Sequence, residues 1–156
     1  MSSVLVALRV KATPRRAFEV FTAEIGLWWK PNGLFHFTPR SPGVLSFEPG
    51  EGGRFLETLP GGKVWEAGRI LVWAPGERLV FTWRVAGFEP DASTTVEVRF
   101  EAIGEETRVT VEHSGWETIP LEHVARHGFP LQHFLQREAE WWQVLLASLR
   151  ARADMR

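Results

Sequence analysis

The chain has 156 residues, with 18 Lys and Arg against 19 Asp and Glu, which gives a formal net charge of −1. This length predicts one domain, residues 1–156, that buries a core without staples. The near-neutral balance argues against a general nucleic-acid binder and against a polybasic membrane-surface protein. Cysteine is absent, which excludes disulfides, thiolate catalysis and cysteine-type zinc sites.

The N-terminal segment predicts a strand and two short helices. Residues 4–11 are rich in Val and Leu, which is typical of a strand. Thr13 followed by Pro14 is a helix start, with Thr as N-cap and Pro at the first helical position. A break near Thr22 separates this helix from a second one through residues 25–29. Residues 31–42 hold three prolines and a glycine and predict a loop.

From about Val44 the apolar pattern changes to a period of two, and turn residues recur at short intervals. This combination predicts antiparallel strands joined as a meander. The strands expected here are residues 44–47, 54–58, 64–73, 78–85, 94–100 and 107–113.

The C-terminal part predicts helix. The sequence predicts a short helix over residues 120–127, closed by Gly128, and a long helix that Pro130 opens and that ends near Arg152. Glu138 interrupts the apolar stripe of the long helix, which consists of Leu131, Leu135, Trp142, Leu145 and Leu149. A single curved sheet has one face to bury, and this helix has the apolar area to cover it. The fold class is therefore α+β.

Six short motifs resemble the helix-grip (START-like, SRPBCC) superfamily, and most closely the branch named after the C-terminal domain of the activator of heat-shock protein 90 ATPase. The motifs are Thr13-Pro14 with Ala17-Phe18, Leu27-Trp28-Trp29, Gly52-Gly53-Arg54-Phe55, residues 68–73 with Pro75, Leu79-Val80-Phe81-Thr82-Trp83, and His113-Ser114-Gly115-Trp116. They cover nearly the whole chain and specify fold better than function. The Phe129-Pro130 junction and the Trp141-Trp142 pair fall outside them.

The resemblance implies a cup-shaped fold with an apolar cavity between the sheet and the long helix. Relatives bind lipids, hormones or polyketides, some are cyclases, and the name of the branch points to a chaperone. The 11 Phe and 8 Trp, with no Tyr, fit either a plain core or the lining of such a cavity.

Two polar residues are candidates for a role in the cavity. His113 shares a strand face with Val109 and Val111, so its imidazole either orients a ligand or moves a proton, or else bonds to a nearby backbone group. Glu138 either anchors a ligand inside the cavity or reaches water at its mouth. Strand register decides the same question for Glu57 and Glu66.

Metal binding is not expected. His123 and His127 are four residues apart on a predicted helix, near His133, but Glu122 precedes His123, so the His-Glu-x-x-His pattern of zinc proteases is missing. No cofactor is expected either, because the glycine-rich turns lead into strands and not into helices.

The leading hypothesis is binding of a small hydrophobic, lipid-like or polyketide-like ligand in the internal cavity. The expected lining residues are Trp29, Phe55, Phe81, Trp83, His113, Glu138 and Trp142. One alternative is a cyclase or aromatase that uses His113 with Glu138 or Glu57 as an acid–base pair. The other is a chaperone-interacting module, which exposed Trp pairs at 28–29 or 141–142 would favour.

The remaining expectations concern partners and location. No nucleic acid and no membrane insertion are expected, and a chaperone or a second copy of the chain are further candidate partners. The apolar run at residues 4–8 is too short for a signal peptide, and no apolar stretch approaches 18 residues. We therefore expect a cytoplasmic protein.

Overall fold

A computed structural model describes residues 3–29, 43–84, 93–119 and 130–155 of the chain. The predicted loop at 31–42, the predicted short helix at 120–127 and Val85 lie outside these ranges.

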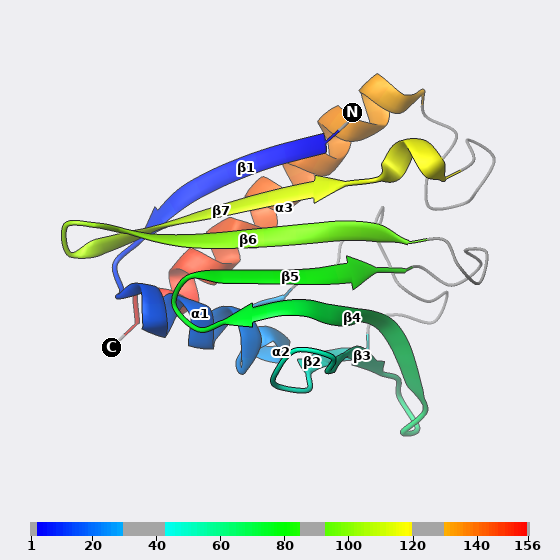
Figure 1. Cartoon of the computed structure of the whole chain (residues 1–156), viewed down its shortest axis with the longest axis horizontal. Helices are drawn as coiled ribbons and strands as arrows, with labels where there is room; N and C mark the ends of the chain where they lie inside the picture. Colours follow the sequence, from blue (N-terminus) through cyan, green and yellow to red (C-terminus); the bar gives the residue numbers. More distant parts are fainter. Residues whose placement is uncertain (1–2, 30–42, 85–92, 120–129, 156) are drawn as a thin grey trace.

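The described strands form one seven-stranded antiparallel sheet in the order β1-β7-β6-β5-β4-β3-β2 (Figure 1). Its strands are β1 (Ser3–Val10), β2 (Val44–Phe47), β3 (Arg54–Thr58), β4 (Val64–Ala74), β5 (Arg78–Trp83), β6 (Thr94–Ile103) and β7 (Glu106–Ser114). The predicted strands and their antiparallel meander are confirmed. β1 pairs with β7, so the first strand closes one edge of the sheet beside the last.

The helices also follow the sequence signals. They are α1 (Pro14–Thr22), α2 (Ile25–Trp28), the short 3-10 helix η1 (Trp116–Thr118) and α3 (Leu131–Ala153). The Thr13 side chain accepts a hydrogen bond from the Arg16 backbone N–H, so it caps α1 as predicted. α3 runs across one face of the curved sheet (Figure 1). This is the helix-grip arrangement.

The core lies between the sheet and α3. Alternating residues of β5, β6 and β7 are buried on the face that α3 covers, while the opposite face carries ion pairs such as Arg78–Glu97 at 2.6 Å. α3 buries Trp142, Leu145 and Leu149 of the predicted stripe. The buried stripe is wider than predicted, because the core also takes Phe134, Trp141 and Leu146, whereas Leu131 and Leu135 are half-buried.

A bulge bends β4 between the part that pairs with β3 and the part that pairs with β5. Phe55 of β3 pairs with Gly68, but the next residue, Leu56, pairs with Glu66, so Ala67 is the extra residue. The Ala67 carbonyl accepts a hydrogen bond from the Arg84 backbone N–H at 2.6 Å. Because of this bend, the first part of β4 pairs with β3 and its second part pairs with β5.

A carboxylate ties the N-terminal helices to the end of α3. Glu24, just before α2, accepts hydrogen bonds from Arg16 at 2.5 Å and from Arg152 at 2.8 Å. These bonds, first from Arg16 and then from Arg152, lower the pKa of Glu24 below its usual value. Since Arg152 lies in the last turn of α3, Glu24 links elements far apart in the sequence.

Glu24→Gln should lower the free energy of unfolding by about 0.5–1 kcal/mol at pH 7. Because the pKa of Glu24 is depressed in the folded state, its contribution is complete above the unfolded value of about 4.3 and is lost as the pH falls through the lower folded value. Urea unfolding at pH 7 and pH 3 should therefore show a smaller difference between wild type and variant at pH 3. Glu77→Gln, at an exposed position, is the control, and an unchanged difference at both pH values would refute this role of Glu24.

Candidate functional site

Polar side chains from four elements meet at one end of the sheet, where β5 ends, β6 begins and β7 ends. Trp83 is the last residue of β5 and pairs with Thr94, the first residue of β6. His113, next to the end of β7, pairs with Val96 of β6 and with Val4 of β1. α3 covers this end of the sheet, so side chains of the helix meet those of the strand ends.

The centre of the site is a buried pair formed by His113 and Glu138. The His113 Nδ1 atom lies 2.7 Å from Glu138 Oε1, and both side chains have zero exposure. Thr94 Oγ1 lies 2.7 Å from His113 Nε2. The indole N–H groups of Trp116 and Trp142 point to Glu138 Oε1 at 2.8 Å and to His113 Nδ1 at 3.2 Å. We call these five residues the polar cluster.

The helix and the turn after β7 explain why these groups meet. Glu138 and Trp142 are four residues apart and therefore share one face of α3. Gly115 follows β7 with a φ of 98°, a conformation that favours glycine, and it turns the chain into η1. The turn brings the indole of Trp116, the first residue of η1, back to Glu138.

Both simpler interpretations of the two polar residues are wrong. His113 has side-chain partners and not a backbone partner among the described residues, and Glu138 does not reach water. The pair instead supplies the acid and base in contact that the cyclase-type alternative requires.

One oxygen of the pair remains without a partner. Glu138 Oε2 is buried and has no hydrogen-bond partner among the described residues. A buried acceptor of this kind is costly for the protein unless something satisfies it.

Tryptophan rings pack against the apolar side of the polar cluster. We call Trp29, Trp83 and Trp142 the aromatic shell, and Trp142 belongs to both groups. The ring of Trp29 lies 5.7 Å from those of Trp83 and Trp142, and Trp83 lies 4.9 Å from His113, measured between ring centroids. Farther along the sheet, Phe55 and Phe81 are 5.0 Å apart. The seven residues predicted to line the cavity are all buried and belong to one continuous cluster of side chains.

The structure adds three residues to the predicted set. Thr94 and Trp116 complete the polar cluster, and Trp141 packs 5.6 Å from Trp83. Pairing in the hairpin of β5 and β6 could have indicated Thr94, since it lies opposite Trp83. Trp116 depends on the turn at Gly115, which strand periodicity does not describe.

The other polar candidates from the sequence do not lie together. Glu57 is buried and accepts a hydrogen bond from the Gly43 N–H at 3.2 Å, whereas Glu66 lies at the surface with Arg69 at 3.1 Å. His123 and His127 lie outside the described residues. In the described ranges, no three His, Asp or Glu side chains gather into a group that could hold a metal ion.

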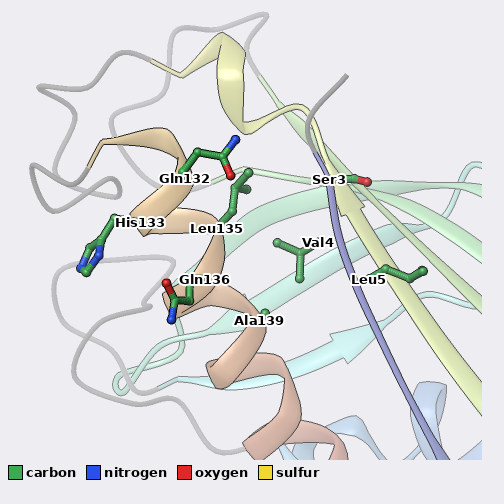
Figure 2. A pocket seen from close by; sticks show the side chains of 8 residues that line it. All are labelled: Ser3, Val4, Leu5, Gln132, His133, Leu135, Gln136 and Ala139. Atoms are coloured by element: carbon green, nitrogen blue, oxygen red, sulfur yellow. The ribbon is translucent and has the colours of Figure 1, made fainter.

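A separate open groove of about 530 Å³ lies between the start of β1 and the first turns of α3 (Figure 2). Its lining residues are Ser3, Val4, Leu5, Gln132, His133, Leu135, Gln136 and Ala139. None of the predicted cavity residues lines it. The groove nevertheless adjoins the polar cluster, because Val4 pairs with His113 across β1 and β7 and Ala139 follows Glu138.

The two Trp pairs do not form a surface patch. Trp28, Trp29, Trp141 and Trp142 are all buried, so the feature expected to favour a chaperone-interacting module is not found at these pairs. Among the described helices, none combines the length and the apolar character needed to cross a membrane.

Solved structures similar to the chain include three of particular interest. CalC from Micromonospora echinospora, described as a self-sacrificing resistance protein, is 28% identical, with 97% of this chain and 94% of that chain covered and a TM-score of 0.61. Txn09, described as an anthrahydroquino-γ-pyrone synthase, is 28% identical, with 97% and 96% covered and a TM-score of 0.58. The Aha1 dimer from Colwellia psychrerythraea is 19% identical, with 99% and 98% covered and a TM-score of 0.66, which shows the shared fold.

No curated protein matches the chain. The model of one protein family does match, over residues 11–153. This range leaves out β1 and includes every other described strand and the whole of α3. The chain therefore belongs to the family of activator of Hsp90 ATPase homolog 1-like proteins.

Proposed function

We propose that residues 1–156 act as one domain that binds a small hydrophobic molecule carrying an aromatic ring system, held against the tryptophans of the aromatic shell and next to the polar cluster. The observation that carries the proposal is the His113–Glu138 pair, 2.7 Å apart and fully buried among indole rings. A buried pair of this kind adds little to stability compared with apolar residues of similar volume. A role in contacting a ligand accounts for its presence in the core.

The composition of the site favours a flat, ring-shaped ligand. Trp29, Trp83 and Trp142 supply large rigid surfaces, and burial of apolar ligand area against them would contribute about 25 cal/mol per Å². The polar cluster would fix the orientation of the ligand. The likeness to Txn09 supports an aromatic ligand, because the product named in its description is a fused ring system.

Replacing a tryptophan of the shell tests this proposal. We expect wild type to bind the neutral fluorescent probe N-phenyl-1-naphthylamine, and Trp29→Leu to weaken that binding by about ten-fold, as loss of an aromatic anchor does. Fluorescence titration gives both dissociation constants.

Trp73→Leu is the matched control for the probe. Trp73 packs edge-on against Phe18 at 5.0 Å and lies beside Leu79, near the start of β5, whereas Trp83 ends that strand. Its loss should change the affinity for the probe by no more than about two-fold. Failure of wild type to bind the probe, or equal losses in both variants, would contradict the proposed function.

A further inference from the structure

We propose that Glu138 Oε2 accepts a hydrogen bond from a hydroxyl group of the bound molecule, so that the site selects hydroxylated aromatic compounds, such as phenols, over their ethers. This inference rests on the proposed function and names the chemical class of its ligand. It starts from the one buried carboxylate oxygen that has no hydrogen-bond partner among the described residues.

The hydrogen bonds of the His113–Glu138 pair do not involve Glu138 Oε2. Because His113 Nδ1 and Glu138 Oε1 are 2.7 Å apart, a proton must lie between them, since two lone pairs would repel at that distance. Oε1 also accepts the indole N–H of Trp116. Neither interaction involves Oε2.

Oε2 is an acceptor wherever the shared proton resides. With the proton on His113, Oε2 belongs to a carboxylate, and with the proton on Oε1, Oε2 is the carbonyl oxygen of the acid. A proton placed on Oε2 itself would find no acceptor among the described residues, which makes that arrangement the costly one. The oxygen therefore calls for a donor.

A hydroxyl is a donor that suits this position. A ligand carboxylate would set acceptor against acceptor, whereas a hydroxyl donates its hydrogen to Oε2 without bringing a charge into a fully buried site.

Two naphthalene compounds test the inference on wild type alone. Isothermal titration should show 2-naphthol binding about ten-fold more tightly than 2-methoxynaphthalene, which has the same ring system and no hydrogen to donate.

Glu138→Gln tests the assigned atom. The amide oxygen would take the place of Oε1, since an amide N–H₂ there would face the Trp116 N–H, and the N–H₂ group would then occupy the Oε2 position. The free position thus changes from acceptor to donor, and the preference for 2-naphthol should disappear. Glu140→Gln, at an exposed position on the same helix, should keep it. Thermal unfolding verifies that each variant is folded.

The outcomes separate the two proposals. If wild type binds both compounds equally, ligand binding stands and the role of Oε2 is refuted. If Glu138→Gln keeps the ten-fold preference, Oε2 is the wrong atom. If neither compound binds, the proposed function fails, and the inference fails with it.

Discussion

His113→Leu should lower the free energy of unfolding by about 3–5 kcal/mol. The variant leaves Glu138 fully buried with the indole N–H of Trp116 as its hydrogen-bond donor among the described residues. Removing one partner of a buried pair leaves a polar group that water does not reach and that has lost its nearest partner, and this cost exceeds the loss of the contact itself. Urea unfolding monitored by tryptophan fluorescence measures the effect.

The double variant His113→Leu/Glu138→Leu should recover much of that loss. With both polar groups gone, the site is apolar among apolar neighbours, and such replacements are often neutral or stabilising. We expect the double variant to be more stable than His113→Leu by at least about 1 kcal/mol. Additive losses would instead mean that the pair stabilises the fold and would weaken the case for a ligand contact.

Gly68→Ala should destabilise the protein by at least about 3 kcal/mol. A Cβ atom at this position would lie 1.8 Å from the backbone oxygen of Thr82 on β5. The obstacle is backbone, so the two strands would have to separate at the bulge where β4 bends. Loss of the bend would also displace Trp83, the residue after Thr82, from the aromatic shell.

Gly104→Ala is the matched control for this substitution. Its φ of 62° is in the left-handed region, but an added Cβ would have no atom within 4 Å. Thermal unfolding should show a loss of only about 1 kcal/mol, which is the cost of the conformation alone. Equal losses in both variants would contradict the close approach of β4 and β5 at Gly68.

The fold could be predicted from the sequence because its signals are local. Thr13 and Pro14 mark the start of α1, and the alternation from Val44 onward marks the strands of the sheet. Each signal depends on neighbours a few residues away, and the helix-grip motifs add the order in which the elements pack. The expectation of one curved sheet around a terminal helix is therefore confirmed.

The site was only partly predictable, because its contacts join distant residues. The sequence marks Glu138 as an interruption in an apolar stripe, but its burial depends on the rotation of α3 about its own axis against β7. Its bond to Trp116 depends on the turn at Gly115. The groove at Val4 and Ala139 arises from the meeting of β1 and α3, which the pattern of either segment alone does not fix.

Indole signals measured by nuclear magnetic resonance test the central proposal most directly. Titration of ¹⁵N-labelled protein with 2-naphthol should shift the indole N–H signals of Trp116 and Trp142, which belong to the polar cluster, and leave that of Trp73 unchanged. A titration that moves none of these signals would contradict ligand binding at the polar cluster. Shifts confined to the side-chain amides of Gln132 and Gln136 would place the ligand in the groove beside β1 instead.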